Sequence, residues 1–487
     1  AQAMLAHAIL VQPIWLTAAA APRRSSGRRA MSLTRLQAPP LGADKEEEEE
    51  ALSQTALFWR DPGSCGAEAT PLAQSPRALI WRALPDGYGD LTVAQSVFSL
   101  TNVIVGAGLL SVPFTFKQSG YAALLVIVGM TGVTCTSGKY LGRCIEMAAR
   151  CREAALEPPA AWDYVFLARI SVGPRFGAAI GAVTALELWI ANVLLTVLGG
   201  RNAAVLGVSP EASMVAAGAV TVALLFVPAR VQAYLSLTST LGMAVCTVAI
   251  VAATFTMGHW ACPSRQLGEA AFVRPENIPR SIGIIMFCYS GHPCIPAVKT
   301  AMKSPSKWDT CMEMSFFTAL VYYATFGLLS YLAFGMGLEE TIADNVIVIP
   351  DALLCKALAA VGCWIKVQCT LPVVLNAIVV SVLPPREGEP HWSPLRVMAA
   401  LAVAASQVAA ALALSHKVAA LAALSGNFIV MVTSVIFPAV VYVALAYRFG
   451  FSETMAHADI FEPCFLITFG TVMAIWGTYL AIEDLIA

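Results

Sequence analysis

The stretch Asn102–Phe114, NVIVGAGLLSVPF, lies in a run of residues apolar enough to cross a bilayer, yet it carries glycines at 106 and 108 and a proline at 113. Glycine lets the backbone leave helical geometry at low cost, and proline disfavours helix just before it. Broken backbone at membrane depth is tolerated where it lines a cavity, and there it can bind a carboxylate or a small cation. The alternative is close packing of neighbouring helices against small residues.

The composition is that of a membrane protein. Of 487 residues 58% are hydrophobic and 13% charged, and the mean hydropathy is +0.70, whereas soluble chains are about 25% charged. A net charge of −1 argues against a nucleic-acid partner. The sequence has no HExxH motif, no GxSxG elbow in context and no CxxC pair. It therefore predicts neither an enzyme nor a cofactor or metal site.

Residues 1–90 differ from the rest of the chain. PRRSSGRRA is basic, DKEEEEE is acidic, and such segments usually stay solvated. The sequence predicts a disordered N-terminal tail here, on the cytosolic side, and a transmembrane domain over 91–487. AMLAHAILVQPIWLTAAAA is either a targeting segment or translated sequence upstream of a start at Met31.

Apolar runs of spanning length recur from residue 91 onward. Eleven spans are predicted, near 91–114, 121–147, 176–200, 213–229, 233–257, 278–300, 311–336, 348–382, 394–415, 418–447 and 460–484. Lys and Arg are more frequent in the loops that lie on the same side of the membrane as the N-terminus. By the positive-inside rule, the sequence predicts that the N-terminus is in the cytosol and the C-terminus is outside.

A second interruption falls in the sixth span. IGIIMFCYSGHPCIPAVKTAM, residues 282–302, contains Ser290-Gly291-His292-Pro293 and Pro296. Interrupted helices in corresponding positions of two halves indicate the binding site of a transporter. The sequence thus predicts an all-α membrane protein with two five-helix repeats, inverted because five is odd, plus an eleventh helix. The predicted substrate-binding residues are Asn102, Gly106, Ala107, Gly108, Leu109, Cys288, Tyr289, Ser290 and Gly291.

Ionisable side chains inside spans are costly and usually functional. Glu187 is predicted to carry a proton or bind a substrate amine, because burial favours its neutral form; the alternative is a structural ion pair. Lys366 is either a fixed cation in the place of a sodium ion or a residue that snorkels or pairs with Glu187. His292 either couples protons or caps the broken helix, and Thr370 is a weaker ion-coupling candidate.

The two interrupted spans resemble the first and sixth spans of the amino acid/auxin permease family. The stretches that carry the resemblance are QSVFSLTNVIVGAGLLSVPFTFKQSGY, IPRSIGIIMFCYSGHPCIPAVKTAM and, in the tenth span, LSGNFIVMVTSVIFPAVVYV. They are most similar to its vacuolar and vesicular inhibitory amino acid transporter branch. The resemblance covers residues 91–484 and implies eleven helices with the leucine-transporter-type fold. Similar members also have a glutamate at the position of Glu187.

The resemblance implies secondary active transport of amino acids, driven by protons across a vacuolar, lysosomal or vesicle membrane. A sodium-coupled carrier of the plasma membrane is the alternative, since related sodium-coupled members resemble the chain at Asn102. An amino acid receptor that signals through its tail is a third hypothesis, from another class. The expected partners are an amino acid, protons or sodium, and the lipid bilayer. The sequence leaves the amino acid unidentified.

Overall fold

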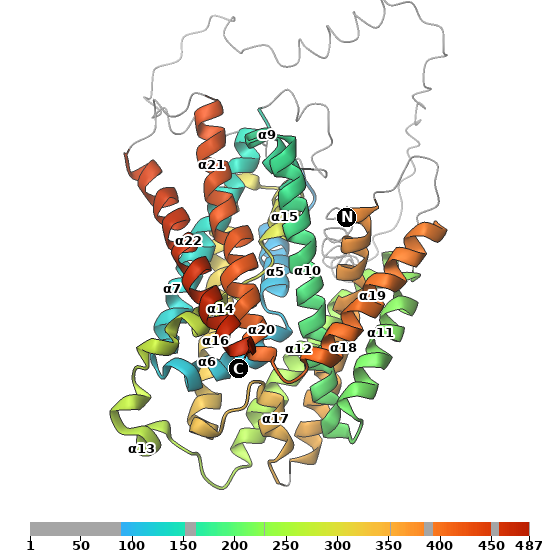
Figure 1. The fold of residues 1–487 in the computed structure, drawn as a ribbon, viewed down its shortest axis with the longest axis vertical. Helices are drawn as coiled ribbons and strands as arrows, with labels where there is room; N and C mark the ends of the chain where they lie inside the picture. Colours follow the sequence, from blue (N-terminus) through green and yellow to red (C-terminus); the bar gives the residue numbers. More distant parts are fainter. Residues whose placement is uncertain are drawn as a thin grey trace, which may run out of the picture.

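The computed structural model describes residues 89–150, 162–227, 229–350, 352–383, 393–449 and 457–486, so the predicted tail lies outside the described residues apart from its last two positions. These ranges are almost entirely helical (Figure 1). The membrane-length segments are α5–η1–α6 (Val93–Ile104, Ala107–Ser111, Val112–Ser119), α7 (Ala122–Ala148), α10 (Pro174–Ala203), α11 (Pro210–Leu225), α12 (Ala229–Phe255), α14–η6–α15 (Ile278–Cys288, His292–Cys294, Ile295–Thr300), α16 (Trp308–Phe334), α18 (Leu353–Val382), α19 (Pro394–Leu414), α20–η9–η10–α21 (Val418–Ser425, Gly426–Val430, Val432–Ile436, Phe437–Arg448) and α22 (His457–Ile486).

The number of membrane-length helices is close to the eleven that the sequence predicts. Nine helices of the described ranges are long and apolar enough to cross a membrane, and the bent pair α5 and α6 makes a tenth. The apolar helix α11, of 16 residues, is the eleventh. The prediction of about eleven helices in an all-α membrane protein is confirmed.

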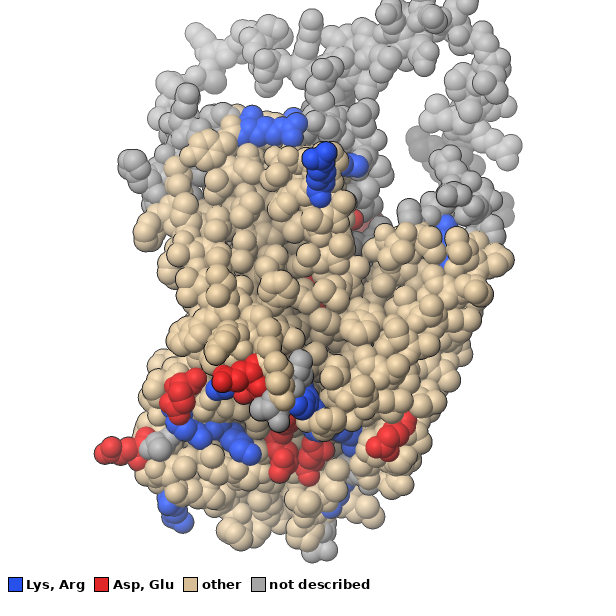
Figure 2. Space-filling model, in the orientation of Figure 1, with Lys and Arg blue, Asp and Glu red and all other residues tan. Residues whose placement is uncertain are grey.

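Charged side chains gather at the two ends of the helical body (Figure 2). The short helices α13 (Pro263–Leu267) and α17 (Ile342–Ile347) mark the lower end, and α9 (Tyr164–Ser171) marks the upper end (Figure 1). On the face shown, the band between the ends is almost free of Lys, Arg, Asp and Glu. Such a band is the surface that lipid covers.

The first span breaks where the sequence predicts. α5 and the following helix are bent by 51°. α5 begins with a capping box, in which Gln95 N–H donates to Thr92 Oγ1 at 3.3 Å and Thr92 N–H donates to Gln95 Oε1 at 2.9 Å. Gly106 is extended, at φ −98° and ψ −174°, and η1 starts directly after it. The first N–H groups of a helix have no partner within it, so this break presents backbone donors at membrane depth.

The sixth span breaks between α14 and η6. Gly291 lies at this break with φ +128°, a backbone conformation that residues other than glycine rarely adopt. A Cβ at this position would also lie 2.6 Å from Val103 Cγ1 of α5. The two broken spans therefore meet at their breaks, and glycine is required for the approach.

A short backbone pairing joins the upper halves of the two broken spans. Leu91 N–H donates to Ala301 O at 2.9 Å, and Lys303 N–H donates to Leu91 O at 2.7 Å. Leu91 and Met302 form an isolated parallel bridge. The residues before α5 are thus hydrogen-bonded to the residues that follow α15.

Lys299, in α15, is an ionisable residue inside a span that the sequence analysis did not single out. Its side chain is 1% exposed, and its Nζ donates to Glu146 Oε1 of α7 at 2.5 Å. The ammonium group also lies 5.4 Å from the centre of the Trp308 ring in α16. This ion pair ties three spans together at the upper end.

Breaking that ion pair is expected to destabilise the protein. Glu146→Gln or Lys299→Met should each lower the free energy of unfolding by about 3 kcal/mol, since the remaining charge stays buried without its partner. The double variant should lose less than the sum of the two. Thermal unfolding in detergent micelles measures all three, and additive losses would show that the pair contributes no coupling.

Candidate functional site

A cavity of about 180 Å³ opens where the two breaks meet. Its walls come from α5 and η1 of the first span, α14 and η6 of the sixth, and from α10, α12 and α18. The volume exceeds that of several water molecules, each of which occupies about 30 Å³ in the liquid. Broken helices thus enclose a site deep in the helical body, as the sequence predicts.

Most of the predicted site residues line this cavity. Those in its wall are Asn102, Gly106, Gly108, Cys288, Ser290, Gly291, Glu187, Lys366 and Thr370. Leu109, Tyr289 and His292 are buried beside the breaks but are not part of the wall. Ala107 is the first residue of η1, directly between the two glycines.

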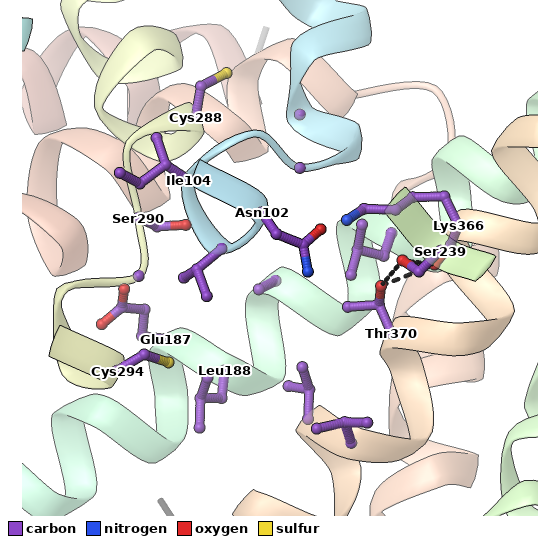
Figure 3. Close-up of a pocket in the computed structure, with 18 of the residues that line it drawn as sticks. Asn102, Ile104, Glu187, Leu188, Ser239, Cys288, Ser290, Cys294, Lys366 and Thr370 are labelled. Carbon is purple, nitrogen blue, oxygen red and sulfur yellow. Dashed lines mark hydrogen bonds between the residues drawn. The ribbon is translucent and has the colours of Figure 1, made fainter. Parts of the chain in front are cut away.

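The described wall of the cavity contains one carboxyl side chain, Glu187, and one amine side chain, Lys366. Each is 4% exposed. Figure 3 shows them on opposite sides of the cavity with Asn102 between them. Among the described residues no ion pair within 4.0 Å joins Glu187 to Lys366, and Glu187 Oε2 is buried without a hydrogen-bond partner. The hypothesis that the two residues pair with each other therefore has no support in this conformation.

Hydroxyl groups surround the Lys366 side of the cavity. Thr370 Oγ1 donates to Lys366 O at 2.8 Å and lies 3.4 Å from Ser239 Oγ of α12 (Figure 3). The Thr240 hydroxyl, also from α12, donates to Asn102 Oδ1 at 2.6 Å. Asn102 is thereby fixed in the wall with its amide oxygen already engaged, and the ammonium group of Lys366 supplies the positive charge.

Tyr323 of α16 holds the two breaks together, which the sequence analysis did not predict. Its hydroxyl is 2.8 Å from Ile104 O and 3.0 Å from Cys288 O, the carbonyl groups that end α5 and α14. One hydroxyl donor thus serves two carbonyl groups that the breaks leave without helical partners. A tyrosine inside an apolar helix gives no sequence signal of this role.

His292 points away from the cavity. Its Nε2 lies 3.0 Å from Thr134 O of α7, and its ring centre is 6.0 Å from that of Phe316. This hydrogen bond joins His292 to α7 and not to an end of the broken helix, so the capping role remains a prediction. Its predicted role in proton coupling also remains a prediction.

The described residues of the site do not form a metal-binding cluster. Within the described ranges no group of three or more His, Cys, Asp and Glu is arranged to hold a metal ion. The cavity wall instead combines free backbone groups, one carboxyl group and one ammonium group, which suit a small dipolar solute.

Comparison with known proteins decides the family. The family model described as transmembrane amino acid transporter protein matches residues 89–483. The chain belongs to this family. It is an amino acid transporter of the amino acid/auxin permease family, not an enzyme, and the breaks in its first and sixth spans lie within the matched residues.

Relatives of this transporter occur in plants and animals. The amino acid transporter AVT1D of Arabidopsis thaliana is 26% identical over 411 residues, which cover 80% of this chain and 70% of the relative. AVT1B of the same plant is 24% identical and covers 95% and 83%. The vesicular inhibitory amino acid transporter of Homo sapiens is 26% identical over 53% of this chain and 49% of its own length.

Among solved structures, the transporter is similar to Mhp1, a nucleobase-cation-symport-1 family transporter, in a closed conformation with bromovinylhydantoin bound. The sequence identity is 13% and the TM-score is 0.46, and the match covers 83% of this chain and 95% of that one.

Proposed function

We propose that this amino acid transporter is driven by protons and works in a vacuolar or vesicle membrane with its N-terminus in the cytosol. The observation that carries the proposal is the pair of unpaired charged side chains, Glu187 and Lys366, in one cavity between two broken helices. A carboxyl group that binds and releases a proton in each cycle cannot be permanently paired. The vesicular relative supports the choice of membrane.

The broken spans supply the substrate site in this proposal. The N–H groups of Ala107 and Gly108, at the start of η1, receive the substrate carboxylate, because a helix start favours negative charge. The N–H of Gly106 already donates to Ile104 O at 2.9 Å, so Gly106 contributes the extended backbone that exposes the next two donors. Cys288, Ser290 and Gly291 line the same cavity, and in the proposal their backbone carbonyl groups bind the amine. Glu187 then carries the proton.

Lys366 acts as a fixed cation in the proposal. Its ammonium group stands beside Ser239, Thr370 and Asn102, where oxygen atoms converge on one side of the cavity (Figure 3). A small hard cation prefers such oxygen ligands, but it would meet the repulsion of the ammonium group. Transport is therefore independent of sodium.

The described Lys and Arg side chains support the proposed orientation. The upper end carries Lys139, Arg143, Arg169 and Lys307. At the lower end near α17, Arg201 is paired with Glu340 and Asp344. The positive-inside rule then favours a cytosolic upper end.

Radiolabelled uptake of the twenty amino acids into proteoliposomes, with and without imposed proton and sodium gradients, tests the proposed function. Concentrative uptake driven by the proton gradient is the expected result. Saturable binding without any flux would instead favour the amino acid receptor.

Replacing sodium by choline is expected to leave the initial uptake rate within about twofold of its value in sodium, because Lys366 already supplies the cation. Collapsing the pH gradient with a proton ionophore should return the internal substrate concentration to the external one. Strict dependence on sodium would place the chain among the sodium-coupled carriers of the plasma membrane.

A further inference from the structure

A single hydroxyl group of α16 supports the cavity from behind. Tyr323 is fully buried, and its hydroxyl lies 2.8 Å from Ile104 O and 3.0 Å from Cys288 O. Ile104 and Cys288 both line the cavity, and Figure 3 shows them beside each other in its wall. The described wall does not include Tyr323 itself. The hydroxyl therefore acts on the cavity through the two carbonyl groups at which its broken helices end.

The contact with Ile104 bears on the carboxylate half of the proposed site. Ile104 O also accepts a hydrogen bond from Gly106 N–H at 2.9 Å. Val105 between them has φ −79° and ψ 82°, close to the geometry of an inverse γ-turn. The extended Gly106 and the start of η1 follow this turn directly. The position of Ile104 O thus helps to set where the N–H groups of Ala107 and Gly108 point.

The contact with Cys288 bears on the amine half. Cys288 is the last residue of α14, so the break deprives its carbonyl group of a partner further along the helix. A carbonyl oxygen has two lone pairs. Cys288 O can therefore accept from Tyr323 on one side and from a substrate amine on the other.

Aromatic packing fixes the position of the Tyr323 ring. Its centre lies 5.1 Å from that of Tyr289, in an edge-to-face arrangement. The Tyr289 hydroxyl is 2.5 Å from Thr131 Oγ1 of α7, and the Tyr289 ring stacks on Phe316 with centres 5.7 Å apart. The Tyr323 hydroxyl is thus held in place by contacts among α7, α14 and α16, although it can still rotate about its C–O bond.

The hydroxyl group has one hydrogen to donate, whereas two carbonyl oxygens lie within hydrogen-bonding distance. The two breaks therefore share one donor. A substrate amine bound at Cys288 O supplies that carbonyl group with a donor of its own. The Tyr323 hydrogen can then turn to Ile104 O, which stabilises the turn that presents the carboxylate donors.

We propose that Tyr323 is the positioning residue that fixes the carboxylate-binding and amine-binding halves of the substrate site relative to each other. The proposal rests on the proposed function, in which the two breaks bind the substrate. An α-amino acid carries both charged groups on one carbon atom, so it needs the two halves at one fixed spacing. Losing the shared donor loosens that spacing and leaves a buried carbonyl group without its partner.

The test is uptake of an equimolar mixture of the twenty radiolabelled amino acids into proteoliposomes by wild-type protein and by Tyr323→Phe. Phenylalanine keeps the ring and removes only the hydroxyl. The half-saturating concentration should rise about tenfold, which corresponds to the loss of one net hydrogen bond. The maximal rate should stay within about threefold, because the change weakens binding and not a later step.

Tyr322→Phe is the matched control. Tyr322 is the neighbouring residue of α16, and its hydroxyl is paired with Thr247 Oγ1 of α12 instead of with a break. This variant should leave the half-saturating concentration unchanged. In place of Tyr323, para-aminophenylalanine offers two N–H donors, one for each carbonyl group, and should restore the wild-type half-saturating concentration. A role in ring packing alone predicts no difference between phenylalanine and para-aminophenylalanine at this position.

Fluorine NMR of fluorotyrosine placed at position 323 gives a readout that keeps the hydroxyl. Its resonance should shift when the amino acid mixture is added, whereas that of fluorotyrosine at position 322 should not. This shift decides between the outcomes if Tyr323→Phe is poorly folded.

An unchanged half-saturating concentration in folded Tyr323→Phe, or a fluorine resonance at position 323 that ignores the amino acid mixture, would overturn the role of Tyr323. The proposed function would stand in that case, provided that wild-type uptake is proton-driven and Gly108→Val lowers affinity. If wild-type protein takes up no amino acid, or Gly108→Val leaves the affinity unchanged, both proposals fail.

Discussion

Glu187→Gln is expected to abolish concentrative uptake while the protein still exchanges substrate across the membrane. Glutamine keeps the size and polarity of the side chain but cannot release a proton. With a gradient of one pH unit, a carrier that moves one proton per substrate can accumulate substrate about tenfold. The variant should reach a concentration ratio of about one. Uptake into proteoliposomes under an imposed gradient, together with counterflow at equal pH, measures both quantities.

Lys366→Met completes this experiment. Glu187 and Lys366 lie on opposite sides of the cavity and form no ion pair, so the effects of the two changes on flux and on folded yield should be additive. A double variant less damaged than either single variant would show that the two residues pair in another conformation of the cycle. Unchanged pH dependence in Glu187→Gln would exclude this residue as the proton carrier.

Gly108→Val is expected to lower substrate affinity by more than about tenfold, the factor that corresponds to 1.4 kcal/mol. A Cβ at Gly108 would lie 3.2 Å from Phe287 Cε1 and 3.3 Å from Cys288 Sγ. The two further methyl groups of valine must then occupy the cavity or displace the wall of the sixth span. Binding of radiolabelled substrate to purified protein gives the affinity.

Gly129→Val is the control for this prediction. Gly129 lies on an exposed face of α7, and a Cβ there would meet nothing within 4 Å. It adds the same side chain to a transmembrane helix without touching the cavity. If Gly108→Val changes the affinity by less than a factor of two, the first break is not the substrate site.

Periodicity and breakers in the sequence were enough to predict the spans. Hydrophobic runs located each of the eleven, and the glycines and prolines near 106–113 and 290–296 located both breaks. The signal is strong because lipid forces the backbone into helix except where protein or a cavity covers it. The first span runs further than predicted, since α6 continues to Ser119 instead of ending near 114.

The composition of the site was only partly predictable. Glu187 and Lys366 were identified because charge at membrane depth is rare. The direction of His292 was not, because it depends on the turn that Gly291 makes at φ +128°. Tyr323 gave no signal, since hydroxyl side chains in spans often bridge helices and its partners, Ile104 O and Cys288 O, come from other spans.

The backbone pairing of Leu91 with Ala301 and Lys303 reduces the number of independent motions at the upper end. Two half-helices with separate connections would each have their own hinge and could swing at different times. Because they are joined by hydrogen bonds of 2.9 and 2.7 Å, we expect α5 and α15 to move together. A spectroscopic label on either half-helix is therefore expected to report the position of both, and we expect this end to open in one step.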